Sequence, residues 1–154
     1  DENNFKKIII NKKQLFSSVK NNHVKFPKYD ILFINSRPTS NQLNYNEKSL
    51  DTIICETSKK YNVITTKKIK KIPCTRDNAL SIYEIGQLSY NCSCIVAIST
   101  GPIWAVLNKK NFDNNKPILI FNNSENLFFN DNTVMSKNIN DIKIFLKRFL
   151  EGSD

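Results

Sequence analysis

Residues 94–107 read CIVAISTGPIWAVL and combine a strand, a tight turn and the start of a helix. The apolar run 94–98 has the length of a strand buried on both faces, which is typical of a parallel sheet. Ser99, Thr100 and Gly101 interrupt this run. Pro102 suits a first helical turn, where its missing N–H has no helical partner. A strand that passes through a short turn into a helix is the repeating unit of α/β folds.

Similar patterns recur along the chain. The apolar runs 31–34 and 117–121 and the β-branched run 62–66 predict strands, and 67–72 predicts another short strand or a basic loop. Helices are predicted over 50–61, 82–92 and 142–149, the second capped by Asp77 or Asn78, and 103–107 begins another. The polar stretches 108–116 and 122–133 are predicted to be loops. We expect Trp104 to pack in the core beneath its helix, with a role as an exposed aromatic platform as the alternative.

The alternation of strands and helices predicts the fold class. It favours an α/β protein with a Rossmann-like parallel sheet flanked by helices, a single domain over residues 30–152. Residues 1–29 are expected to be a connecting segment that packs on this domain, because their apolar residues fit neither period and Pro27 breaks any regular element.

Composition limits the classes of protein. The chain has 154 residues, of which 40% are hydrophobic, and its mean hydropathy is −0.42. No apolar run approaches the ~20 residues that span a bilayer, and no secretory signal begins the chain. The four cysteines lack zinc-site spacing, so we expect no metal, no cofactor, reduced thiols and a cytoplasmic location.

The net charge of +9 comes mainly from lysine and is unevenly distributed along the chain. Lysine supplies 20 of the 23 basic residues, and most of the excess falls in residues 1–76. Arginine is preferred for recognising bases, and the chain has only three arginines, so we expect no nucleic-acid partner. We interpret the charge, including the basic stretch 67–71, mainly as a solvated surface; the alternative is steering of a phosphorylated small molecule or contact with nucleic acid.

Two polar segments follow predicted strands, where open parallel sheets bind ligands. One is 35–42, which contains one of the three arginines. The other is the Ser-Thr-Gly-Pro turn at 99–102, where a glycine allows close approach to the backbone. Together they predict a pocket able to neutralise a pyrophosphate, although an ordinary helix cap also explains the turn. The G-x-G-x-x-G and P-loop patterns are absent, which argues against the commonest nicotinamide and NTPase sites.

The stretch 31–122 resembles the C-terminal, nucleotide-sugar-binding half of GT-B-fold glycosyltransferases, in particular the heptosyltransferase type (glycosyltransferase family 9). The similar segments are 35–42, 81–89 (SIYEIGQLS) and 99–102. The resemblance implies that the turn holds a diphosphate, that Arg37 and Ser40 contact phosphate, that Glu84 serves the ribose, and that Thr65 and Thr66 line the base. The predicted substrate-binding residues are Ser36, Arg37, Ser40, Gln42, Thr65, Thr66, Glu84, Ser99, Thr100, Gly101 and Pro102.

The resemblance also implies a function. It predicts a donor-binding domain for a nucleotide-diphosphate sugar, with metal-independent, inverting sugar transfer once it is joined to an N-terminal acceptor domain that this chain lacks. The family usually has a histidine shortly after the turn, where this chain has Trp104 and Ala105. No Ser-His-Asp, Cys-His or paired-carboxylate pattern identifies a catalytic residue. The alternatives are a non-enzymatic Rossmann-like module that binds a nucleotide or a protein, and a nucleic-acid-binding protein.

Overall fold

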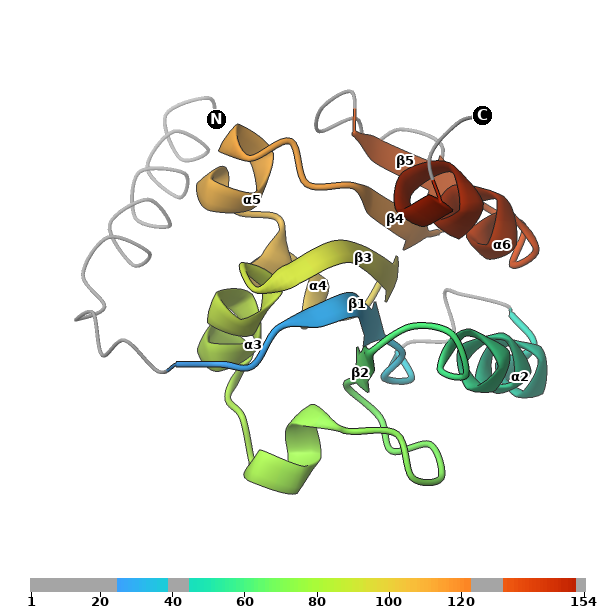
Figure 1. Ribbon diagram of the computed structural model, residues 1–154, viewed down its shortest axis with the longest axis horizontal. Coiled ribbons are helices and arrows are strands. Elements are labelled where there is room, and N and C mark those ends of the chain that lie inside the picture. The colour runs from blue at the N-terminus through green and yellow to red at the C-terminus, as the bar shows by residue number, and fades with distance from the viewer. Residues whose placement is uncertain (1–24, 39–44, 123–131, 152–154) are drawn as a thin grey trace, which may run out of the picture.

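The computed structural model describes residues 25–38, 45–122 and 132–151. Within them, five parallel strands form one sheet in the order β2-β1-β3-β4-β5 (Figure 1). The strands are β1 (Tyr29–Ile34), β2 (Val63–Thr65), β3 (Cys92–Ile98), β4 (Ile118–Phe121) and β5 (Thr133–Ser136). The α/β Rossmann-like fold predicted from the sequence is therefore confirmed. Residues 1–24 of the expected connecting segment lie outside the described residues, as do Ser40 and Gln42.

A single parallel bridge extends the sheet beyond β2. It joins Thr65 to Cys74, and the amide of Thr65 donates to the carbonyl oxygen of Pro73 at 3.0 Å. If this bridge is counted as a rudimentary strand, the order in the sheet becomes 3-2-1-4-5-6, the order of dinucleotide-binding Rossmann folds. Residues 67–72 contain no strand and form a loop, the second of the two predicted alternatives, with a turn in which the amide of Ile72 donates to the carbonyl of Ile69. The bridge follows at Cys74.

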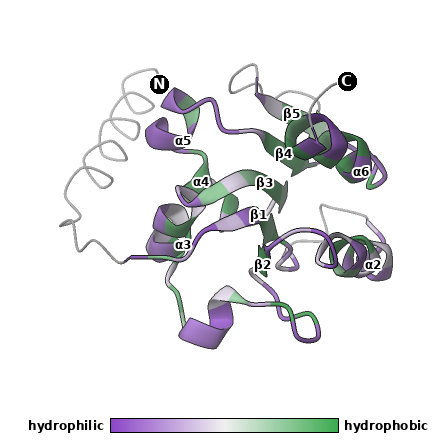
Figure 2. Ribbon diagram, in the orientation of Figure 1, coloured by the Kyte–Doolittle hydropathy of each residue, from purple (hydrophilic) through white to green (hydrophobic). Residues whose placement is uncertain are grey.

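Helices cover both faces of the sheet (Figures 1 and 2). One face carries α2 (Glu47–Thr57), α6 (Asp141–Leu146) and the helical turn η2 (Lys147–Glu151). The other carries α3 (Ile82–Ser89), α4 (Ile103–Val106) and α5 (Lys109–Asp113). A short 3-10 helix, η1 (Thr75–Asn78), precedes α3. The continuous apolar runs are explained by this arrangement, because both faces of the central strands are buried.

Successive side chains of β1 alternate between two cores. Ile31 and Phe33 pack with Leu50 and Ile54 of α2, whereas Leu32 packs on the face covered by α3 and α4. All three β1 side chains are at most 1% exposed. Burial of this extent is the main source of stability, at roughly 25 cal/mol per Å² of apolar surface.

Three local predictions are wrong. Residues 108–116 were expected to be a loop but contain α5. Strand β5, which begins at Thr133, was not predicted, and residues 123–131 of the predicted loop 122–133 lie outside the described residues. Helix α3 is capped by Ser81, whose hydroxyl accepts from the amide of Glu84, whereas Asp77 belongs to η1. Trp104 is 60% exposed and does not lie in the core, because α4 turns Ile103 and Val106 inward instead.

Candidate functional site

The two predicted loops leave neighbouring strands at the same edge of the sheet. Ile34, the last residue of β1, pairs with Ala97 of β3, so the segments that begin at Asn35 and Ser99 start side by side. The chain moves to one side of β1 to form β2 and to the other side to form β3, β4 and β5. The carboxyl edge at β1 and β3 is therefore the switch point of the sheet, the usual ligand position in such folds.

The Ser-Thr-Gly-Pro turn leaves polar groups without partners. Thr100 is 9% exposed, and its hydroxyl is buried with no hydrogen-bond partner among the described residues. Within the same residues, neither the amide of Thr100 nor that of Gly101 donates to another protein group. A β-carbon placed on Gly101 would meet nothing within 4 Å. The turn thus leaves two backbone amides unpaired beside open space, whereas the Thr100 hydroxyl is buried and would reach an anion only after its side chain rotates.

Ser99 and Pro102 hold the ends of this turn. The amide of Ser99 donates to the carbonyl of Phe121 in β4 at 3.1 Å, and Pro102 stands at the N-cap of α4. Helix α4 has only four residues, so the dipole contribution expected from a helix here is small. Any anion binding has to come from the amides of the turn itself and from neighbouring cations.

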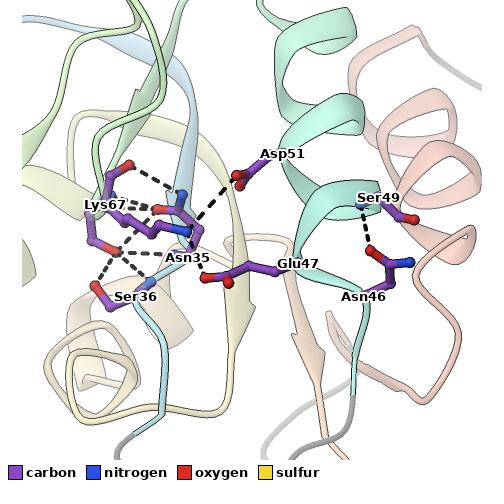
Figure 3. Close-up of polar contacts among 8 residues, drawn as sticks. Asn35, Ser36, Asn46, Glu47, Ser49, Asp51 and Lys67 are labelled. Carbon is purple, nitrogen blue, oxygen red and sulfur yellow. Dashed lines mark hydrogen bonds and ion pairs between the residues drawn. The ribbon is translucent and has the colours of Figure 1, made fainter.

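A hydrogen-bond network fixes the start of the first loop (Figure 3). The buried Asn35 side chain accepts from the amide of Lys67 at 2.8 Å and donates to the Lys67 carbonyl at 3.2 Å. The Thr66 hydroxyl accepts from the Ser36 hydroxyl at 2.9 Å and the Ser36 amide at 3.2 Å. These contacts tie the ends of β1 and β2 together and orient the loop that carries Arg37. Asn35 was not among the predicted site residues, although a polar residue directly after a buried strand could have been predicted to lie at this edge of the sheet.

Arg37 is exposed at this edge and forms no ion pair with any described residue. Its positive charge contributes to lowering the pKa of Glu47, after the larger effect of the hydrogen bond from Lys67. Arg37 therefore lies within electrostatic range of the first turn of α2. An exposed, unpaired guanidinium at the carboxyl edge of the sheet is suited to bidentate contact with a phosphate.

A second charged group near β1 was missed by the sequence analysis (Figure 3). Lys67 Nζ lies 2.6 Å from Glu47 Oε1 and 3.9 Å from Asp51 Oδ2. The hydrogen bond with Glu47 raises the pKa of Lys67 and lowers that of Glu47. The other oxygen of Asp51 and the hydroxyl of Tyr45 are buried without partners among the described residues, and burial raises the pKa of Tyr45. Glu47 and Asp51 are four residues apart, which places both carboxylates on one face of a helix, and this spacing could have predicted a shared cation.

Four predicted residues have side chains engaged within the protein. Thr65 is fully buried and its hydroxyl donates to the Pro73 carbonyl at 3.3 Å, while Ser36 and Thr66 bond each other in the network above. Glu84 accepts from the amide and the hydroxyl of Ser81 at 2.8 and 2.7 Å, which lowers its pKa. The base and ribose contacts assigned to these residues stay predictions, and the Thr65 side chain could reach a ligand only after rearrangement.

The space between the strand ends and helices α2 and α6 is small and apolar. A recess there holds about 10 Å³, roughly one water molecule. Its lining includes Phe33, Tyr45, Leu50, Ile98, Phe121 and Ile142. A nucleotide does not fit into such a recess, so a ligand at this edge has to lie above the strand ends, against the turns.

Other features of the described residues bear on function. No group of three or more His, Cys, Asp or Glu side chains there could hold a metal ion. None of the helices in residues 25–38, 45–122 and 132–151 has the length and apolar character that crossing a bilayer demands. Comparisons with protein-family models, curated proteins and solved structures found no match to this chain.

Proposed function

We propose that this chain is the donor-binding domain of a GT-B-type glycosyltransferase and binds a nucleotide-diphosphate sugar. One observation carries the proposal: the unpartnered amides and buried hydroxyl of the 99–101 turn lie at the end of β3, next to the β1 end that carries the unpaired Arg37. The resemblance of 35–42, 81–89 and 99–102 to heptosyltransferase-type sequences supports the same assignment.

The role of this domain is electrostatic. When a sugar leaves a nucleoside diphosphate, negative charge accumulates on the leaving phosphate. Backbone amides of Thr100 and Gly101 and the guanidinium of Arg37 donate to that charge without a metal ion. An acceptor domain supplies the attacking hydroxyl and its general base, and transfer then inverts the anomeric centre. The open space at Gly101 allows a phosphate to approach the backbone closely.

Thermal unfolding in the presence of ADP, UDP, GDP and their sugar derivatives tests the proposal. We expect the nucleotides that carry one of the three bases to raise the melting temperature at millimolar concentration, since a ligand that binds only the folded state stabilises the folded protein. Arg37→Ala removes a charge-assisted contact and should weaken binding about tenfold or more. Gly101→Val should abolish binding by filling the approach to the turn.

The controls separate loss of binding from loss of folding. Gly101 has open space around it and lacks the left-handed φ that side chains avoid, so Gly101→Val should leave the unliganded melting temperature unchanged. Arg148→Ala removes an exposed arginine on η2 that stacks over Phe149, and it should bind like wild type. No stabilisation by any of the nucleotides, or normal binding by both site variants, would refute the proposal.

A further inference from the structure

The chain has one tryptophan, and the structure exposes it beside the candidate turn. The Trp104 side chain is 60% exposed, while Ile103 and Val106 on the same short helix are buried. The amide of Trp104 donates to the carbonyl of Gly101 at 3.3 Å, so the indole stands one helical turn beyond the glycine. Leaving a large aromatic ring in water forgoes the free energy of burial, and such rings at a surface often mark contact sites.

Other exposed apolar side chains lie on the adjoining helix. Helices α3 and α4 touch at Gly86, where an ideal β-carbon would come within 2.9 Å of the carbonyl oxygen of Ala105. Ile82 and Tyr83 precede Gly86 by one turn on the same side of α3 and are 56% and 39% exposed. Trp104 directly precedes Ala105. Ile82, Tyr83 and Trp104 are thus exposed on two short helices that meet at Gly86 and Ala105.

We propose that the indole of Trp104 stacks on the nucleobase of a nucleoside diphosphate whose phosphates bind the 99–101 turn, an inference that rests on the proposed function. Trp104 is three residues beyond Gly101, about 5 Å along the helix axis. A base stacked on Trp104 lies on the α4 side of the turn, so in this inference Trp104 replaces Thr65 and Thr66, at the end of β2, as the contact for the base.

The surroundings favour a base over a sugar as the stacked ring. A sugar needs several hydrogen bonds around its hydroxyls, whereas the exposed side chains identified here, Ile82, Tyr83 and Trp104, offer mainly apolar and aromatic surface. A planar base gains most of its binding free energy from stacking on an aromatic face and tolerates such surroundings. Trp104 would thus supply affinity for the nucleoside, and the turn would supply affinity for the diphosphate.

Because there is one tryptophan, its fluorescence reports on this position alone when excitation avoids tyrosine. Each of ADP, UDP and GDP, with inorganic pyrophosphate as a base-free probe, is titrated while fluorescence and melting temperature are both recorded. We expect the nucleotide that stabilises the fold to quench Trp104 along the same binding curve, and pyrophosphate to stabilise the fold without quenching. Trp104→Ala should weaken binding of that nucleotide about tenfold, and Trp104→Phe should restore most of it.

The two readouts distinguish the two claims. Stabilisation by a nucleotide without quenching, or unchanged nucleotide affinity in Trp104→Ala, overturns the stacking inference and leaves the proposed function standing. The absence of stabilisation by all four probes overturns both. Trp104→Ala should leave pyrophosphate binding and the unliganded melting temperature unchanged, because the side chain is largely exposed. A loss of pyrophosphate binding in that variant would indicate a structural role for the indole and contradict the inference.

Discussion

Asn35 and Thr66 exchange hydrogen bonds across the carboxyl ends of β1 and β2. The backbone amide of Asn35 donates to Thr66 Oγ1 at 3.0 Å, and the backbone amide of Thr66 donates to Asn35 Oδ1 at 3.1 Å. Both residues are at most 3% exposed. This reciprocal contact fixes the point where the Arg37 loop leaves the sheet, so the site geometry depends on it.

Asn35→Ala should destabilise the protein by about 1–3 kcal/mol, because the buried amide of Thr66 and the partly buried amide of Lys67 lose the Asn35 side-chain acceptor. Urea unfolding monitored by circular dichroism gives the free energy of unfolding. Asn140→Ala is the matched control, since the Asn140 side chain makes no capping hydrogen bond and the residue is exposed; its effect should stay within about 0.5 kcal/mol. Equal effects of the two substitutions would mean that the network contributes little.

Gly86→Ala should destabilise the domain by about 1–2 kcal/mol. Alanine favours a helix by about 1 kcal/mol over glycine, but the new β-carbon would lie 2.9 Å from a backbone oxygen of α4, which cannot move aside like a side chain. Thermal or urea unfolding measures the loss. Gly101→Ala is the control, with open space around the added methyl group, and should be neutral. A stabilising Gly86→Ala substitution would show that α4 is not held against α3 as described.

The contact between Glu47 and Lys67 should make stability depend on pH at the acid end. The pKa of Glu47 is lower in the folded protein than its ordinary value of 4.5, chiefly through its hydrogen bond with Lys67. A lowered carboxyl pKa contributes stability above the ordinary value and loses it as the pH falls through the folded value. Because 38% of the Glu47 side chain is exposed, the contribution should be no more than about 0.5–1 kcal/mol.

Glu47→Gln measures this contribution. Its free energy of unfolding should be lower than that of wild type at neutral pH, and the difference should vanish well below pH 4.5. Glu56→Gln, on the same helix, removes a more exposed carboxylate 3.1 Å from Lys143 and should cost less at neutral pH. A difference between Glu47→Gln and wild type that is constant from neutral to acid pH would rule out the ionic origin.

The sheet could be predicted from the sequence because its central strands are buried on both faces. The apolar runs at β1, β3 and β4 have strand length and no helical period, so burial alone identified them. Strand β5 escaped prediction because Thr133–Ser136 is an edge strand with an exposed Val134 and little apolar content. An edge strand is defined by its neighbour rather than by its own composition.

The candidate site was predicted less completely. The two strand-end segments could be predicted because parallel strands present their carboxyl ends at one edge. The contact of Lys67 with Glu47, twenty residues away in sequence, depends on how α2 packs. The exposure of Trp104 depends on which side of a single helical turn faces the core, and four residues are too few to show a period.

Amide chemical shifts on titration with ADP, UDP and GDP test the central claim most directly. The chain has three glycines, so the amide signal of Gly101 can be assigned readily. The account predicts that one nucleotide shifts the amide signals of Ser36, Arg37, Thr100 and Gly101 together, with a common dissociation constant. Shifts confined to other parts of the sheet, or none with any of the three nucleotides, would contradict it.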